Sequence, residues 1–368
     1  MSIILEIHHI NVGAGDSTLI IVRDKTKLRK KLETKKVVIP TDEYKWLQLC
    51  LDKANNIPLV GTVNQTVLID AGNDQSTANK VNTYLKRMGV AKLDHIIASH
   101  YHQDHVGGLA VLLKDFTLTG FSAIYDRGDY RPPPAGENKA YLTYKRAALL
   151  NGRIRNKVDA KTNFEIDLGV GNKGRKIILK CVSSDGDFIN SKSVKGDVRN
   201  GNDYGLSWLI QYGAFRYFTG GDLGGFSDLG GPKSKMSPYI KVETPLIQSI
   251  EGADVSKYRN GQKLNGHICA FKINHHGSHY SSDPRFFAGM RPSSAIISCG
   301  DKHQHPHALS ISDIENKTWN VADSTADKND YPPGVPKNGN GEVENTLQKY
   351  ICTSLRKKFK VDDLRKNI

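Results

Sequence analysis

The sequence feature that most constrains this chain is the segment Ser99–Gly108, which reads SHYHQDHVGG. It holds three histidines and one aspartate within six residues, and it directly follows a mostly apolar run, Leu93–Ala98, that predicts a buried strand. Side chains two residues apart share one face of an extended chain, so the first two histidines are expected to point together. The segment predicts a metal site, because imidazole nitrogens and carboxylate oxygens bind zinc and similar cations. Its candidate ligands are His100, His102, Asp104 and His105.

Two glycines end this segment. Gly107 and Gly108 are expected to let the backbone pack tightly before the next helix, which the sequence places at Leu109–Asp115. Asp104 and His105 are expected to reach around a turn, so that they form a second metal position beside the first two histidines.

A further carboxylate follows a predicted hairpin. Two strands, Leu206–Tyr212 and Phe215–Thr219, are separated by Gly213 and Ala214, and the second strand is followed by Asp222. A carboxylate at the end of a buried apolar strand needs a partner, since burying an unpaired charge is costly. We interpret Asp222 as a ligand that bridges two metal ions; the alternative is an ordinary turn residue.

Two adjacent histidines follow another predicted strand, Ala270–Asn274. Neighbouring side chains at a strand end point in opposite directions, so only one of His275 and His276 is expected to bind metal. Nearer the N-terminus, Asp16 lies in a glycine-rich turn between two strands. Its carboxylate either supports the metal loop from behind or simply stabilises the turn.

The other predicted elements alternate between strands and helices, which is typical of α/β layers. The expected strands are Ile3–Ile7, Thr66–Asn73, Ser122–Tyr125, Ile177–Val182 and Ala295–Gly300, and the expected helices are Ser76–Met88 and Ala140–Leu150.

The spacing His-x-His-x-Asp-His after a strand, closed by Gly-Gly, is similar to the signature of the metallo-β-lactamase fold superfamily. The whole series resembles one branch of it, the hydrolase domain of the ComEC/Rec2-like DNA-uptake proteins and their free-standing relatives. The resemblance implies an α/β fold, a four-layer αββα sandwich with the metals at one edge of its two sheets. The matching elements are Val12–Asp16, Leu68–Gly72, His100–Gly108, Thr219–Asp222, Lys272–Ser278, Ser298–Gly300 and His305-Pro306.

The resemblance also implies two divalent metal ions, zinc or manganese. The first would be bound by His100, His102 and Asp222, and the second by Asp104, His105, Asp222 and His276. Lactamase-type members carry a histidine where this chain has Asn202. The first metal would therefore have three protein ligands and open positions, which is typical of catalytic rather than structural sites.

The chemistry that the resemblance implies is attack of a metal-activated hydroxide on a phosphodiester or another ester. Asp104 is then a candidate to orient the nucleophile. His275 and His305 are candidates to hold a substrate phosphate or to protonate the leaving oxygen, although His305 also fits a histidine-rich surface loop. The candidate substrate-binding residues are Asn202, Ser278 and Lys302.

The composition favours an anionic partner. The 368 residues carry a net charge of +14 with a pI near 9.4, which suits nucleic acid or another phosphodiester substrate. Three basic groups are candidates to contact phosphates away from the metals: Arg23–Lys36, the cluster of Arg153, Arg155 and Lys157, and Arg356–Lys360.

The sequence also bears on the cellular compartment. No apolar run reaches the roughly 18 residues of a membrane span, and the start lacks the features of a signal peptide. The five cysteines are widely spaced and form no CxxC pair, which favours a reducing compartment. A cytoplasmic protein is therefore expected.

The expected division is a hydrolase domain at residues 1–310, with insertions near 23–63 and 126–200, and a C-terminal extension at 311–368. Within the extension, Asp327–Gly341 is predicted to be a linker and Glu342–Lys360 a terminal helix. The helix is predicted because apolar side chains recur every four residues. It could pack on the domain, bind a protein partner or contact nucleic acid. The recurring residues are Leu347, Ile351, Leu355 and Phe359.

Three functions fit these observations. The first is a metal-dependent nuclease or phosphodiesterase. The second is a hydrolase of a small ester, such as a lactone or a phosphorylcholine-type ester, which would show little salt dependence, whereas nucleic-acid binding weakens steeply with salt. The third is a metal-binding regulatory subunit that acts with a partner and turns over little substrate.

Overall fold

A computed structural model describes residues 3–34, 36–38, 61–114, 120–129, 137–189, 193–194, 201–225, 242–254, 268–278, 280–282, 284–300, 305–315, 318–320, 342–344 and 349–353. The predicted linker at 327–341, the basic end at 356–360 and the candidate residue Lys302 lie outside these residues.

The first sheet has six strands in chain order. The first three run antiparallel to one another, and the following pairs are parallel. The carboxyl ends of β3, β4 and β5 therefore meet at one edge of the sheet. The strands are β1 (Ile3–His9), β2 (Thr18–Asp24), β3 (Thr62–Ile69), β4 (Leu93–Ile97), β5 (Phe121–Asp126) and β6 (Arg155–Lys157).

The second sheet has the order β16-β13-β12-β11-β10-β8-β7, with β9 paired to β8. Its predicted hairpin is confirmed, since β10 and β11 pair antiparallel. Its strands are β7 (Glu165–Val170), β8 (Lys176–Ser184), β9 (Asp187–Phe188), β10 (Ser207–Tyr212), β11 (Phe215–Thr219), β12 (Ala270–Lys272), β13 (Ser294–Ile297) and β16 (Lys349–Cys352).

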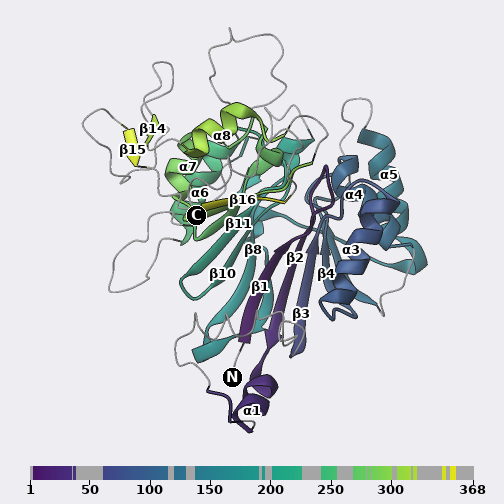
Figure 1. The fold of residues 1–368 in the computed structure, drawn as a ribbon. Coiled ribbons are helices and arrows are strands. Elements are labelled where there is room, and N and C mark those ends of the chain that lie inside the picture. The colour runs from purple at the N-terminus through teal and green to yellow at the C-terminus, as the bar shows by residue number, and fades with distance from the viewer. Residues whose placement is uncertain are drawn as a thin grey trace.

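Helices cover the outer faces of both sheets. Figure 1 shows α3, α4 and α5 on one side of the strands and α6, α7 and α8 on the other. This arrangement is the αββα sandwich predicted from the sequence, and that prediction is confirmed. The helices are α1 (Thr26–Thr34), α3 (Gln75–Arg87), α4 (Gln103–Leu112), α5 (Glu137–Ala148), α6 (Glu243–Asp254), α7 (Pro284–Met290) and α8 (Ala308–Glu315).

Side chains along the strands of the first sheet point alternately to its two faces, and they contribute to two separate hydrophobic cores. On β2, Ile20 and Val22 join a cluster with residues of the second sheet, whereas Leu19 and Ile21 join a cluster with α3, α4 and α5. Side chains two apart share a face, so one strand is buried on both sides. The two cores hold the strand ends, and so the residues that follow them, in fixed positions. No helix among the described residues is both long and apolar enough to cross a membrane.

The predicted terminal helix at 342–360 is wrong for the described part of that range. Residues 342–344 form β15, which pairs with β14 (Thr318–Asn320), and residues 349–352 form β16, which pairs in parallel with β13. The edge of the second sheet binds this segment through backbone hydrogen bonds, and such tertiary pairing outweighs a local four-residue periodicity. The chain after residue 310 thus contributes to the sandwich.

The basic run at 23–36, a candidate to contact phosphates, does not form one exposed surface. Arg23 is fully buried, and it donates hydrogen bonds to the Glu6 carboxylate (2.9 Å) and to the Met88 carbonyl (2.9 Å). Lys25 is buried as well. The exposed cations of this run lie on α1 or just after it, at the opposite end of β2 from Thr18, and Figure 1 shows α1 far from α4. Seven residues of strand separate the two ends by roughly 20 Å.

Candidate metal centre

The metal motif spans the end of β4 and the first turn of α4. His100 and His102 precede the helix, while Asp104 and His105 lie inside it, where the sequence predicted a turn. Gly107 and Gly108 are also inside α4 rather than before it. A Cβ atom on either would collide with backbone of the 71–73 loop that follows β3. The glycines therefore let α4 lie directly against that loop.

Backbone hydrogen bonds join the two segments. The amide of Ala71 donates to the carbonyl of His105 (3.0 Å), and the amide of Gly108 donates to the carbonyl of Gly72 (2.8 Å). Asp70, which directly follows β3, is thereby placed against the side chain of His105, with 2.8 Å between Oδ2 and Nδ1.

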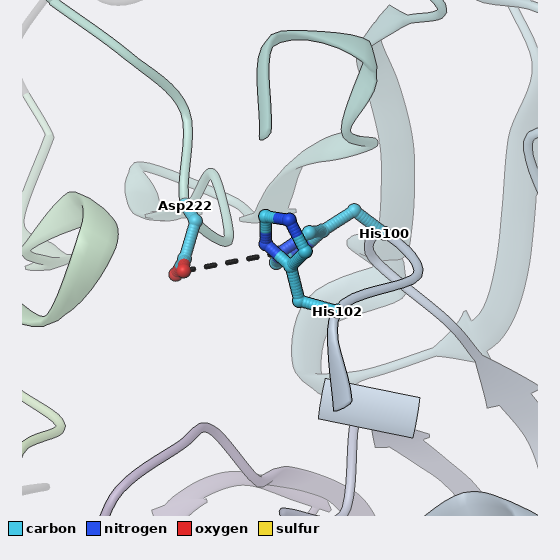
Figure 2. A group of neighbouring side chains, drawn as sticks. All are labelled: His100, His102 and Asp222. Carbon is cyan, nitrogen blue, oxygen red and sulfur yellow. Dashed lines mark hydrogen bonds and ion pairs between the residues drawn. The ribbon is translucent and has the colours of Figure 1, made fainter. Parts of the chain in front are cut away.

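A first group of donor atoms comes from His100, His102 and Asp222. Figure 2 shows Asp222 facing the two histidines from a separate segment of the chain. His100 Nε2 lies 2.9 Å from His102 Nδ1 and 3.8 Å from Asp222 Oδ2. Three donor atoms this close together can bind one cation.

A second group consists of Asp104, His105 and His276. Asp222 adjoins this group too, since its Oδ2 lies 3.2 Å from His105 Nε2 and 3.3 Å from His276 Nε2. Asp104 Oδ2 lies 3.5 Å from His276 Nε2. Asp222 therefore stands between the two groups, in the position expected of a bridging ligand.

The histidine rings are oriented by partners behind them. His276 Nδ1 donates to the Ser298 carbonyl (2.9 Å), and His105 Nδ1 faces Asp70. His100 Nδ1 lies 3.1 Å from the Ser99 hydroxyl, which itself donates to Asp70. Partners on Nδ1 direct Nε2 of each ring into the site, as is usual for metal-binding histidines.

The residues fit a metal site because buried donors are left without partners. His105 Nε2, His276 Nε2 and Asp222 Oδ1 are buried and have no hydrogen-bond partner. Buried polar atoms are nearly always satisfied, so several orphaned ligand atoms in one place need an explanation. Divalent cations bound among them supply one.

The histidines and carboxylates of the site shift one another's pKa values. Burial and the neighbouring His105 and His102 rings hold the pKa of His100 well below its usual value. Burial also acts to lower the pKa of His105 and of His276, but the carboxylates around them outweigh it and raise both well above that value. Burial acts to raise the pKa of Asp222, but the histidines, His105 first, hold it well below its usual range.

The backbone of the paired histidines differs from the extended strand end that the sequence predicted. His275 and His276 lie in a 3₁₀ turn, η8 (Asn274–Gly277), with left-handed backbone at φ 48° and 55°. Both rings consequently approach Asp222, and His275 Nε2 lies 3.8 Å from its Oδ2. Only His276 belongs to a donor group, and burial lowers the pKa of His275 to about 4.

The remaining candidate residues differ in how close they lie to the donor groups. The His305 ring is centred 5.7 Å from that of His275 and 6.1 Å from that of His276, so the structure brings it to the site. Asn202 is buried at the start of η7 (Asn202–Tyr204), and the chain just after it bonds to the Ser99 carbonyl. Ser278 is buried, and its hydroxyl accepts from the Tyr280 amide in the turn after η8.

One side of the site is more open than the rest. The side chain of Asp104 is 27% exposed and that of His275 is 14% exposed, while those of His100 and His105 are fully buried. A substrate would therefore approach along the side that carries Asp104 and His275.

Sequence reasoning assigned no role to two residues that the structure brings to the site. Asp70 contacts His105, and Lys272 pairs with Asp16. Asp70 carried a usable signal, because it is a carboxylate at the end of an apolar strand, as Asp222 is. Asp16 lies behind the candidate ligand His276, with Oδ1 3.4 Å from its Nδ1.

Comparisons with known proteins agree with this architecture. The family model described as metallo-beta-lactamase superfamily matches residues 52–176, which include β3, β4 and the metal motif. No curated protein sequence matches the chain.

Several solved structures are similar at low identity. The metallo-beta-lactamase fold protein YhfI from Bacillus subtilis is 12% identical, with a TM-score of 0.36 over 68% of this chain and 80% of that one. CmlA, a diiron beta-hydroxylase from Streptomyces venezuelae, is 12% identical, with a TM-score of 0.34 over 68% and 46%. A diphosphatase from the PhnP family is 14% identical, with a TM-score of 0.33 over 67% and 73%. The family match and the layered sheets together show that this chain has the metallo-β-lactamase fold.

Proposed function

We propose that this protein is a metal-dependent hydrolase that cleaves phosphodiesters. The observation that carries the proposal is the convergence of two donor groups on Asp222, with buried nitrogen and oxygen atoms that have no other partner. A first cation would be held by His100, His102 and Asp222. A second would be held by Asp104, His105 and His276 together with Asp222. Zinc and manganese are the cations proposed.

Two divalent cations at such a site lower the pKa of a bound water and neutralise charge on the attacked phosphate. The chain itself supplies orientation and proton transfer. Asp104 presents a partly exposed carboxylate that can accept a hydrogen bond from the attacking water. His275, which is neutral near pH 7 because its pKa is about 4, can donate a hydrogen bond to a phosphate oxygen at the open side. His305 lies beside it and can contact the same group.

Nucleic acid is the first substrate class that we propose. The net charge of +14 and the resemblance to the ComEC/Rec2-like branch support it. A small phosphodiester is the second candidate, and a specific observation favours it. Of the basic groups expected to hold a polymer, Arg23 is buried, α1 lies at the far end of β2, and Arg155 is engaged by Asp126 at 2.7 Å.

The test is hydrolysis by zinc-loaded and manganese-loaded protein. The substrates are single-stranded DNA, duplex DNA, RNA, cyclic nucleotides and bis(p-nitrophenyl) phosphate. His102→Ala and Asp222→Ala should lower metal content and abolish hydrolysis, whereas His8→Ala, on β1 and outside the donor groups, should retain both. Full activity after removal of metal by a chelator would refute the proposal. Bound metal with no turnover on any substrate would favour a regulatory subunit.

A further inference from the structure

A buried lysine lies at the candidate metal centre. Lys272 ends β12 and is 1% exposed. Its Nζ donates hydrogen bonds to the carbonyls of Gly221 (2.9 Å) and Ile273 (3.1 Å), and it forms an ion pair with Asp16. An ammonium group has three donors; here two are hydrogen-bonded to carbonyls, and the charge is paired with the Asp16 carboxylate. Burying such a group is costly unless it is fully paired, so its presence calls for a reason.

The ion pair determines where Asp16 points. Lys272 engages Oδ2 of Asp16, while Oδ1 lies 3.4 Å from His276 Nδ1. The carboxylate therefore stands behind His276, on the side opposite to Nε2. The backbone of Asp16 is fixed too, because its amide donates to the Asp104 carbonyl (3.3 Å) and its carbonyl accepts from the Gly72 amide (3.0 Å).

The same ammonium group also holds the turn that presents Asp222. The carbonyl of Gly221 accepts from Lys272 and from the backbone amide of His275 (3.0 Å). Gly221 has left-handed backbone at φ 58°, and Asp222 follows it directly. The ammonium group of Lys272 thus joins three segments: the Asp16 turn, the turn before Asp222, and the start of η8, which carries His276.

We propose that Lys272 is a positioning residue for the second metal site, acting through Asp16 and Gly221. It holds the Asp16 carboxylate beside His276 Nδ1, which donates to the Ser298 carbonyl, and thereby keeps this carboxylate out of the set of metal ligands. Two of the four donor groups include Asp16. With Asp16 engaged by Lys272, the groups left for metal are the two that the proposed function uses. This inference rests on that proposed metal centre.

The test measures zinc affinity by competition with a fluorescent chelator. Lys272→Met keeps the length of the side chain and removes the charge. We expect zinc binding at the tighter site to weaken by about 10-fold to 100-fold, which is the usual effect of losing a partner behind a metal-binding histidine. Lys180→Met, on β8 of the same sheet, is the matched control and should bind zinc as the wild type does.

A second variant separates positioning from stability. Lys272→Met leaves Asp16 buried and unpaired, so the single variant is expected to melt at a lower temperature. The double variant Asp16→Asn/Lys272→Met removes both charges. It should regain most of the Tm of the metal-free protein while its zinc affinity stays low, because neither the carboxylate behind His276 nor the Gly221 anchor is restored.

The outcomes are distinct. Wild-type affinity in Lys272→Met, or recovery of zinc affinity together with Tm in the double variant, would overturn the positioning role and leave the metal centre standing. If Lys272→Met cannot be isolated folded, the double variant alone decides. If the wild-type protein binds no zinc, both this inference and the proposed function fail.

Discussion

The Nδ1 atom of His105 lies 2.8 Å from the Oδ2 atom of Asp70. This contact directs Nε2 of His105 toward Asp222, because the two ring nitrogens point away from each other. Asp70 also accepts from the backbone amide (2.8 Å) and the hydroxyl (2.6 Å) of Ser99. A single buried carboxylate thus orients one proposed ligand directly and fixes the residue that precedes another, His100.

The first prediction concerns this carboxylate. Asp70→Asn should weaken zinc binding at the second site by about 10-fold to 100-fold, because an amide oxygen polarises an imidazole less than a carboxylate does. The measurement is a chelator competition assay on the purified variant. Asp167→Asn, at an exposed position on β7, is the control and should bind as the wild type does. Equal affinities in the two variants would exclude this role for Asp70.

The second prediction concerns unequal metal sites. His105 Nδ1 faces the Asp70 carboxylate, and the Asp16 carboxylate lies 3.4 Å from His276 Nδ1, which donates to the Ser298 carbonyl. His100 faces only a hydroxyl, that of Ser99. Carboxylate partners raise ligand basicity, so we expect the second site to bind the first equivalent of zinc more tightly. His102→Ala should then retain about one equivalent of tightly bound zinc, and His276→Ala should lose the tight phase of the titration. The reverse pattern would show that the first site is the stronger one.

The third prediction separates the paired histidines. His275→Ala should reduce turnover while metal content stays near that of the wild type, because His275 is in none of the donor groups that the described residues form. His276→Ala should lower metal content instead. Elemental analysis and the rate on bis(p-nitrophenyl) phosphate together distinguish the two effects. Loss of metal in His275→Ala would make it a ligand in its own right.

Much of the site was predictable because its residues share a local pattern. Three of the predicted histidine ligands and Asp104 lie within one short segment, so spacing brings them together. Asp222 follows a strand of the other sheet, and the resemblance to the family placed it with them. The backbone of η8 could not be predicted in this way. His275 and His276 hold left-handed backbone angles because Gly221 and Ser298, which are distant in the sequence, bond to this turn.

Two other differences have the same origin in long-range contacts. Arg23 looks like part of an exposed basic run, but Glu6 on the neighbouring strand pairs with it and buries it. Residues 349–352 fit a helical periodicity, but the free edge of β13 pairs with them. Neither partner can be identified from the local sequence, because each lies far away along the chain.

The fourth prediction concerns pH and the metal-free protein. The pKa values of His105 and His276 are raised above 6.5 by the surrounding carboxylates, against the effect of burial. Their protonation therefore stabilises the folded metal-free protein fully below pH 6.5, and this contribution is lost as pH rises through the raised values. We expect the Tm of chelator-treated protein to fall above pH 6.5 and the Tm of zinc-loaded protein to change less.

Two variants test whether the decline in Tm with pH arises from the histidines of the metal centre. His105→Gln should flatten the decline in Tm of the metal-free protein, since it removes one of the two groups. His8→Gln, on β1, should leave the decline as it is in the wild type. A metal-free Tm that rises steadily between pH 6.5 and 9 would contradict the assignment.

The last prediction concerns the basic helix α1. Arg29 and Lys30 are exposed on it, at the end of β2 that lies roughly 20 Å from the Asp16 turn. Duplex DNA rises about 3.4 Å per base pair, so a duplex shorter than about six base pairs cannot span this distance. Replacing both residues by Gln should leave cleavage of bis(p-nitrophenyl) phosphate and of such short duplexes unchanged. For a duplex of about 20 base pairs, each lost phosphate contact should reduce the salt slope of binding by about one unit.

A lower rate of bis(p-nitrophenyl) phosphate cleavage in this variant would instead indicate damage to the metal centre or to folding. An unchanged salt slope on the long duplex would leave α1 as a solvated surface and would favour a small phosphodiester as the substrate.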